Sequence, residues 1–143
     1  MSWSPPSGRD CVCWLELKRL TQPQTWSFCR VRKILALRLF DDEGKRWQKS
    51  AKDLQLEILC ISQFTLYHRL KGNKPDFSAA MKGDDAQKLY THFLNRLKQS
   101  YDSSKIKDGK FGANMQVHIE NDGPVTINLE SPDRKQPDDC VDK

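Results

Sequence analysis

The chain has 143 residues, of which 37% are hydrophobic and 30% are charged, and its formal net charge is +5. This length suits one domain with its own core, and the clustering of the apolar residues excludes a wholly disordered chain. The basic charge permits contact with a polyanion without establishing it. No apolar stretch is long enough to span a bilayer.

Five cysteines are spread along the chain, and the first residues have neither the basic start nor the apolar core of a secretory signal. We therefore expect free thiols in a reducing compartment, with the cytoplasm favoured and the nucleus as an alternative. Cys11 and Cys13 are too close together for the usual zinc spacing, and no metal or other cofactor is expected. Cys60 lies in an apolar run, which predicts a small buried hydrophobic residue.

Helix and strand patterns alternate over the first half of the chain. Thr25 and Ser27 are candidate N-caps for a helical pattern that follows them. Residues 37–40 alternate like a strand, and the turn sequence at 41–45 predicts a hairpin. The hairpin precedes an apolar run at 55–62, which predicts a buried strand.

The strongest helical pattern covers residues 85–100. Asp84 is a candidate cap, and Gln87 three residues later completes a start that resembles a capping box. The apolar residues of this segment form one stripe at helical spacing, which predicts a helix that covers a sheet. The stripe consists of Ala86, Leu89, Tyr90, Phe93, Leu94 and Leu97.

Two basic loops and two further strands complete the pattern. Residues 67–83 combine basic residues with the glycine and proline that are typical of loops. Residues 101–112 form a second predicted loop, with Lys105, Lys107 and Lys110. Residues 115–119 and 125–129 alternate like strands and are joined by a short turn. Beyond Pro132 we expect a charged, disordered tail.

Two polar motifs lie where predicted strands end, which is the usual place for a site on a rigid scaffold. Ser-Gln-Phe-Thr-Leu at 62–66 leaves the buried strand, and Asn-Asp-Gly-Pro-Val-Thr at 121–126 joins the last two strands. Three further segments surround them: Val-Arg-Lys-Ile-Leu at 31–35, Leu-Lys-Gly-Asn-Lys-Pro-Asp-Phe at 70–77 and Lys-Asp-Gly-Lys-Phe-Gly-Ala at 107–113. Together these motifs resemble the D-aminoacyl-tRNA deacylases, enzymes that remove D-amino acids mischarged onto tRNA.

The resemblance implies one α/β domain at residues 31–131, with a mostly antiparallel, barrel-like set of strands and two packed helices. Family members begin with strands that residues 1–30 do not match. We therefore expect missing N-terminal strands, a divergent and partly disordered segment at 1–30, and a charged flexible tail at 132–143. Residues 11–17 could still pair as a strand, although their flanks resemble loops. Without the family's first strands, an edge of the central sheet should be open.

The resemblance also implies an activity. The expected reaction is hydrolysis of the ester bond of D-aminoacyl-tRNA, and of glycyl-tRNA formed on tRNA-Ala, as a proofreading step that needs no cofactor. The alternative is a non-catalytic member of the family that binds RNA or pairs with another subunit. A basic nucleic-acid-binding module would explain the lysines but not the two motifs.

The catalytic residues that the resemblance implies are Ser62, Gln63, Phe64 and Thr65. A hydroxyl nucleophile normally needs a base within hydrogen-bond reach, and His68 would face the opposite side of an extended segment. Hydroxyl, amide and backbone N–H groups can instead orient an ester and stabilise an oxyanion. We therefore favour hydrolysis assisted by the 2′-hydroxyl of the tRNA, with Thr65 as a positioning group. Thr65 as the direct nucleophile is the alternative.

Further residues are assigned to substrate binding by the resemblance. In the family a cis Gly-Pro pair, here Gly123 and Pro124, enters the pocket of the other subunit of a homodimer, where its carbonyls exclude an L side chain. Phe111, Gly112 and Met115 would line the pocket, with the Phe111 ring against the terminal adenosine, although core packing is an alternative for this ring and for Met115. The basic loops would meet acceptor-stem phosphates, or form only a solvated surface, through Arg69, Lys71, Lys74, Lys107 and Lys110.

Overall fold

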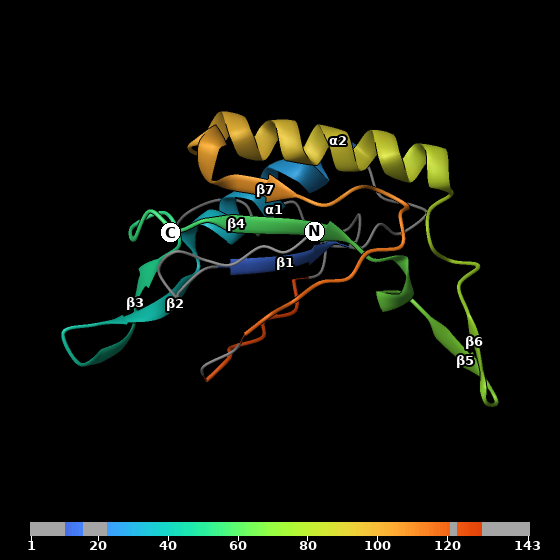
Figure 1. Ribbon diagram of the computed structural model, residues 1–143, viewed down its shortest axis with the longest axis horizontal. Coiled ribbons are helices and arrows are strands. Elements are labelled where there is room, and N and C mark those ends of the chain that lie inside the picture. The colour runs from blue at the N-terminus through green and yellow to red at the C-terminus, as the bar shows by residue number, and fades with distance from the viewer. Residues whose placement is uncertain (1–10, 16–22, 121–122, 130–143) are drawn as a thin grey trace.

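Two helices pack over a three-stranded sheet, and two hairpins extend from its ends (Figure 1). This computed structural model describes residues 11–15, 23–120 and 123–129. In chain order the elements are β1 (Cys11–Leu15), α1 (Pro23–Ala36), β2 (Arg38–Asp42), β3 (Lys45–Ser50), β4 (Ile58–Ser62), the 3-10 turn η1 (Phe64–Leu66), β5 (Arg69–Lys71), β6 (Lys74–Asp76), α2 (Gly83–Ser100), the 3-10 turn η2 (Ser103–Lys105) and β7 (Ile106–Asp108). The predicted mixed α/β class with two helices is confirmed.

The main sheet is parallel, in contrast to the mostly antiparallel arrangement that the resemblance implies, and β4 lies at its centre. β1 pairs with β4 from Cys11 opposite Ile58 to Leu15 opposite Ser62, and β7 pairs along the other side of β4. Residues 58–61 of β4 are all buried, as expected for a strand covered on both faces. Residues 11–15, which the sequence left as a possible strand, therefore form one edge strand of this sheet.

Both helices begin earlier than the sequence pattern predicts. α1 starts at Pro23, a residue favoured at the first helical position because it has no N–H to leave unpaired. The two candidate cap residues therefore lie inside the helix. α2 starts at Gly83, because the Lys82 carbonyl accepts the Ala86 N–H at 2.8 Å. Asp84 consequently lies in the first turn, where its charge still suits the helix dipole.

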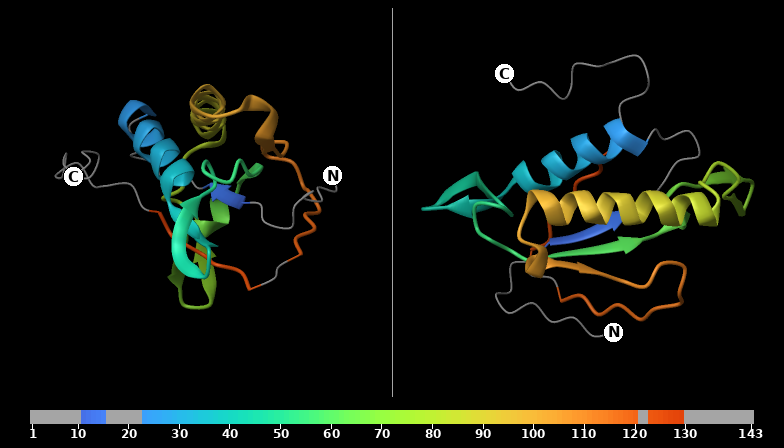
Figure 2. Two further views of the ribbon diagram at one scale, coloured as in Figure 1. Left: turned by 90° about the vertical axis from the view of Figure 1, so that its left-hand side faces the viewer. Right: turned by 90° about the horizontal axis from the view of Figure 1, so that it is seen from above.

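The core lies between the sheet and the two helices, which cover the same face of the sheet (Figure 2). The predicted apolar stripe of α2 is buried along its whole length. Val31 and Leu35 are the buried contribution of α1, and Ile58 and Cys60 are that of β4. No helix among the described residues is long and apolar enough to cross a membrane.

The predicted hairpin before β4 is confirmed as β2–β3. Its turn residues Glu43 and Gly44 have φ values of +46° and +77°, the signs that a type I′ turn requires. The predicted basic loop at 67–83 contains a second hairpin, β5–β6, in which Gly72 has a φ of +61° at the first of two turn residues. The second predicted loop contains β7.

The strands predicted at 115–119 and 125–129 are not formed, and this prediction is wrong for the described residues. The segment leaves β7, turns and returns past the side of the sheet away from the helices (Figures 1 and 2). Its side chains alternate between half-buried and exposed from Phe111 to His118. Alternating burial of side chains is not sufficient for a strand, because its backbone N–H and C=O groups must also pair with a neighbouring strand. Both sides of β4 are already taken by β1 and β7.

Candidate active site

The first motif begins where β4 ends, and β1 holds it in place. Ser62 is the last residue of β4 and lies opposite Leu15. The next backbone N–H, that of Gln63, donates to the Leu15 carbonyl at 2.8 Å and so extends the pairing by one residue. The chain then turns into η1. Leu15 holds Gln63 only because of the register between β1 and β4. The residues of the motif therefore could not predict that Leu15 supports it.

Gln63 and Thr65 form a pair within the motif. The Gln63 side-chain amide donates to the Thr65 hydroxyl oxygen over 2.5 Å, and both residues are half-buried. Because the hydroxyl oxygen accepts this bond, its own hydrogen is left to donate elsewhere. The pair can therefore present an oriented O–H donor to an ester, as the positioning role of Thr65 requires.

The only histidine near the motif in sequence contacts its backbone. The His68 ring nitrogen Nδ1 lies 3.0 Å from the Thr65 carbonyl oxygen. The structure thus joins the His68 ring to the main chain of Thr65, whereas the side-chain partner of the hydroxyl is Gln63. This arrangement agrees with the argument that His68 does not act as the base for Thr65.

Phe64 connects the motif to the neighbouring hairpin. Its side chain is 60% exposed, yet its ring meets the Phe77 ring edge-on, with the centroids 5.3 Å apart and an interplanar angle of 77°. Phe77 directly follows β6. The Phe64 ring therefore contacts the hairpin and keeps a large exposed surface for a ligand or a partner chain.

The three predicted pocket residues of this part of the chain follow β7, which pairs with the side of β4 opposite β1. Phe111 is half-buried, and its ring contacts the Tyr90 ring of α2 with centroids 5.5 Å apart. Met115 covers Gly109, where an added Cβ would come within 3.0 Å of the Met115 sulfur. Gly112 is exposed and has a φ of +68°. In this chain Phe111 and Met115 therefore make packing contacts, as expected if they belong to the core and not to a substrate pocket.

Gly123 and Pro124 lie in an exposed segment outside helices and strands, with Gly123 at a bend. The described residues contain no cis peptide bond, so the expected cis form of this pair is absent from the single chain. An X-Pro bond prefers trans by about 0.5–1 kcal/mol, and nothing lies within 4 Å of a Cβ built on Gly123 to impose the other isomer. Asn121 and Asp122 of the same motif lie outside the described residues.

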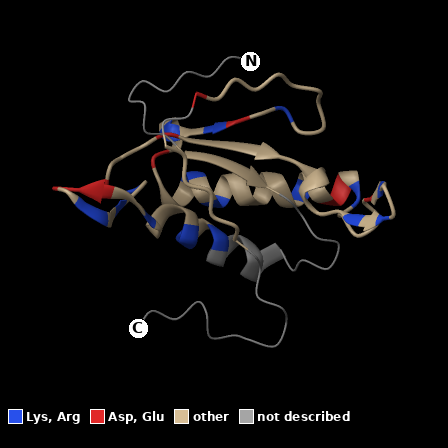
Figure 3. Cartoon of the chain, turned by 90° about the horizontal axis from the view of Figure 1, so that it is seen from below, with Lys and Arg blue, Asp and Glu red and all other residues tan. Residues whose placement is uncertain are grey.

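The five predicted tRNA-contact residues divide into two groups. Lys71 is paired with Asp76 at 2.6 Å, and Lys107 with Glu57 at 3.5 Å. The Lys71 ammonium, followed by the Ser78 N–H and hydroxyl, holds the pKa of the Asp76 carboxyl well below its usual range. The other three are exposed to solvent: Arg69, Lys74 and Lys110. Figure 3 shows lysine and arginine on hairpin β5–β6 and along α1.

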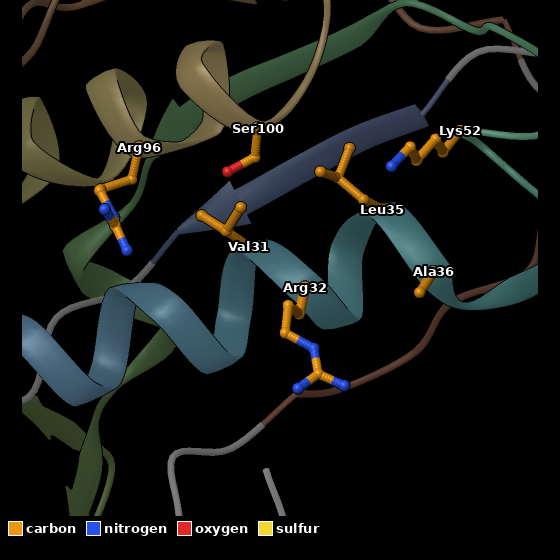
Figure 4. Close-up of a pocket in the computed structure, with 7 residues that line it drawn as sticks. All are labelled: Val31, Arg32, Leu35, Ala36, Lys52, Arg96 and Ser100. Atoms are coloured by element: carbon orange, nitrogen blue, oxygen red, sulfur yellow. The ribbon is translucent and has the colours of Figure 1, made fainter. Parts of the chain in front are cut away.

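Two surface cavities lie over the helices and not at the motifs. One, of about 620 Å³, is lined by α2 residues that include Asp84 and Lys88. The other, of about 260 Å³, has the buried side chains of Val31 and Leu35 at its floor (Figure 4). Its remaining lining residues are Arg32, Ala36, Lys52, Arg96 and Ser100. Neither cavity contains a predicted site residue.

Among the described residues, no three His, Cys, Asp or Glu side chains are grouped to hold a metal ion.

A family model described as D-Tyr-tRNA(Tyr) deacylase matches residues 11–130. The chain belongs to this family. The match starts at Cys11, so it includes β1 and α1 as well as the motifs from which the resemblance was drawn.

Three similar proteins illustrate the relationship. The chain is 80% identical over 113 residues to D-aminoacyl-tRNA deacylase of Drosophila melanogaster, covering 79% of this chain and 72% of the relative. It is 64% identical over 103 residues to D-aminoacyl-tRNA deacylase 1 of Homo sapiens, covering 71% of this chain but only 49% of the relative, so it spans about half of that protein. A solved structure named c-Myc DNA Unwinding Element Binding Protein superposes with a TM-score of 0.81 at 54% identity, covering 87% of this chain and 83% of the other.

Proposed function

We propose that this chain hydrolyses the ester bond of D-aminoacyl-tRNA and releases free D-amino acid and tRNA as a proofreading step in translation. The observation that carries the proposal is the hydrogen-bonded pair Gln63–Thr65 at the end of the central strand. The pair lies in a chain that belongs to the deacylase family. The names of the relatives support the same chemistry. Because the smallest side chain would pass a filter that rejects L side chains, glycyl-tRNA formed on tRNA-Ala is a second substrate.

The hydrolysis is assisted by the substrate. The 2′-hydroxyl of the terminal adenosine lies next to the ester and supplies the group that a protein base would otherwise supply. The Thr65 O–H, oriented by Gln63, donates to an oxygen at the reacting centre, and backbone N–H groups of the motif stabilise the developing oxyanion. Thr65 as the direct nucleophile is the competing mechanism.

The active unit is a homodimer in which Gly123 and Pro124 of one subunit complete the site of the other. Large apolar side chains with substantial exposure lie within or beside both motifs, and such surfaces mark interaction sites. They are Trp14 on β1, Phe64 and Leu66 on η1, and Ile119, Val125 and Ile127 around the second motif. A partner subunit would bury these side chains and give the second motif the contacts that it lacks in one chain.

The substrate end of the tRNA meets both basic loops. Arg69, Lys74 and Lys110 are exposed and can contact acceptor-stem phosphates directly, whereas Lys71 and Lys107 must first leave their carboxylate partners. The exposed part of the Phe111 ring stacks on the terminal adenosine. The cytoplasm is the compartment that suits this substrate.

The test compares the release of tyrosine from D-tyrosyl-tRNA and from L-tyrosyl-tRNA by the purified chain, with light scattering in the same buffer. Rapid release from the D form alone, by a dimer, is the expected result. A folded chain that binds both tRNAs and releases neither amino acid would establish the alternative, a non-catalytic RNA-binding member of the family. Activity of a monomer would refute the cross-subunit site while leaving the reaction intact.

A further inference from the structure

Two cysteines lie opposite one another beneath the first motif. Cys13 on β1 pairs in register with Cys60 on β4, the central strand. Both are free thiols and both belong to the side of the sheet that faces the helices, where Cys60 is fully buried and Cys13 is half-buried. Their side chains leave register-matched positions of adjacent strands and contribute to the same core. The two side chains therefore share one small space between neighbouring strands.

The spacing of the strands suits a covalent link. Neighbouring strands lie about 4.8 Å apart, and disulfides join residues whose Cα atoms are about 4.4–6.8 Å apart. Register-matched residues on adjacent strands also present their side chains on the same face of the sheet. Cys11, two residues earlier on β1, lies opposite Ile58, so it has no cysteine opposite it on β4.

We propose that Cys13 and Cys60 form an oxidation site, at which a hydroperoxide converts the two thiols into a disulfide that joins β1 to β4. This modification is independent of the deacylase reaction and involves no residue of the two motifs. Cys13 is the reactive thiol and Cys60 is the resolving thiol.

The chemistry balances with one hydroperoxide molecule. The Cys13 thiol loses its proton, and the thiolate sulfur attacks one oxygen of hydrogen peroxide, the oxidant. The O–O bond breaks, a sulfenic acid forms on Cys13, and the departing hydroxide takes up the released proton to give one water. The Cys60 sulfur then attacks the Cys13 sulfur, its proton leaves with the departing hydroxide as a second water, and the S–S bond forms. Two electrons have passed from the thiols to the peroxide.

The surroundings of the two thiols set the order of these steps. The adjacent Cys60 thiol lowers the pKa of the Cys13 thiol, and Arg30 contributes in the same direction against the effect of burial. The adjacent Cys13 thiol, burial and the charge of Asp108 raise the pKa of Cys60, while Lys98 opposes the rise. Cys13 is also the more exposed of the pair. A lower pKa and greater access both favour Cys13 as the thiol that meets the oxidant.

Oxidation at this place would act on the support of the first motif. Leu15 and Ser62 lie two residues after Cys13 and Cys60, and the Leu15 carbonyl holds the Gln63 N–H. The Cys60 carbonyl also accepts the Tyr90 hydroxyl at 2.9 Å and the Gly109 N–H at 3.1 Å. A bond between the two sulfurs would tie the edge strand β1 to a strand that is already fixed on its other side.

The experiment uses the whole chain with Cys29 and Cys140 replaced by alanine, so that three thiols remain. This protein and its Cys11→Ala, Cys13→Ala and Cys60→Ala variants are treated with hydrogen peroxide, and unreacted thiols are blocked. Digestion under non-reducing conditions and mass spectrometry then locate any cross-link. Circular dichroism before oxidation establishes that each variant is folded.

The expected result is a loss of two hydrogen atoms and a 13–60 cross-link in the parent and in Cys11→Ala, reversed by dithiothreitol. The thermal midpoint of these two proteins should rise on oxidation and fall again on reduction. Cys60→Ala should stop at a sulfenic acid on Cys13 that a dimedone probe captures. The proposal is overturned if the parent gains oxygen atoms without a cross-link, if Cys11 supplies the partner, or if Cys60 is labelled by dimedone before Cys13.

Discussion

The Gln63 side-chain amide donates to the Thr65 hydroxyl over 2.5 Å, so two residues of one motif fix each other's position. The bond uses the acceptor side of the hydroxyl and leaves its hydrogen for the substrate. A side chain that only positions the substrate should be replaceable by one with the same O–H group. A side chain that forms a covalent intermediate need not be.

Thr65→Ala should therefore lower the kcat for D-tyrosyl-tRNA by about 100-fold, the loss typical of one removed donor at a reacting oxygen. Thr65→Ser should retain most of the activity, because serine keeps the hydroxyl that Gln63 orients. Single-turnover deacylation measures both. Thr91→Ala is the matched control, since the Thr91 hydroxyl only donates to the Gln87 carbonyl on an exposed helix face. Trapping an aminoacyl adduct on Thr65 would rule out the positioning role.

Local signals predicted the local elements of this fold. The helical spacing of its apolar residues was enough to predict α2. The turn residues Glu43 and Gly44 were enough to predict the β2–β3 hairpin. β7 was missed because Ile106 is its one buried residue, and its identity as a strand comes from pairing with β4.

The candidate site divides in the same way. The motif Ser62–Leu66 could be found in the sequence, whereas its support by Leu15 depends on the register of two strands that are far apart along the chain. The arrangement around Gly123 could not be predicted either, because contacts to a partner chain leave no periodicity in the sequence.

Asp76→Asn should strengthen tRNA binding at low salt. The Lys71 ammonium is held 2.6 Å from the Asp76 carboxylate, and that charge competes with a phosphate for the lysine. Removing it should tighten Kd and make the logarithm of the binding constant fall more steeply with the logarithm of salt concentration, by up to about one unit of slope. Filter binding at several salt concentrations measures this slope. An unchanged slope would mean that Lys71 does not reach the tRNA.

The ratio of D to L turnover is the control for that variant, since phosphate contacts lie away from the α-carbon. Lys110→Ala, which removes an exposed lysine, should weaken binding and lower the slope. A change of chiral preference in either variant would place the basic loops inside the substrate pocket.

Tyr90→Phe should lower the free energy of unfolding by about 1 kcal/mol, the typical net contribution of one hydrogen bond. The Tyr90 hydroxyl donates to the Cys60 carbonyl, while the ring contact with Phe111 would survive the change. Chemical denaturation at neutral pH measures the difference. A loss several times larger would mean that the ring itself had moved, which the near-ultraviolet circular dichroism would reveal.

The same hydroxyl should make the stability of the parent protein fall at alkaline pH. Burial, followed by the charges of Cys60, Asp108 and Cys13, raises the pKa of Tyr90 above its usual value near 10. The folded state favours the neutral phenol, so this contribution to stability is complete below the unfolded pKa and is lost as the pH rises above it. Tyr90→Phe should show a smaller loss of stability than the parent between neutral pH and pH 11. An identical loss would contradict the assignment.

Gly123→Ala should separate function from folding. Gly123 has a φ of +60°, which an alanine adopts only with strain, but it lies in an exposed segment outside helices and strands. The segment can relax, so the free energy of unfolding should change by less than about 0.5 kcal/mol. Deacylation should fall at least about tenfold, because the new Cβ would stand where this loop meets the partner's substrate.

Gly44→Ala is the matched control for that variant. Gly44 also has a positive φ, +77°, and also has open space at its Cβ position, but it lies in the tight turn between two paired strands. Its replacement should cost about 1–2 kcal/mol of stability and leave turnover by the folded fraction unchanged. If Gly123→Ala formed a dimer with full activity and full preference for the D substrate, the Gly-Pro loop could not be the part of the molecule that meets the α-carbon.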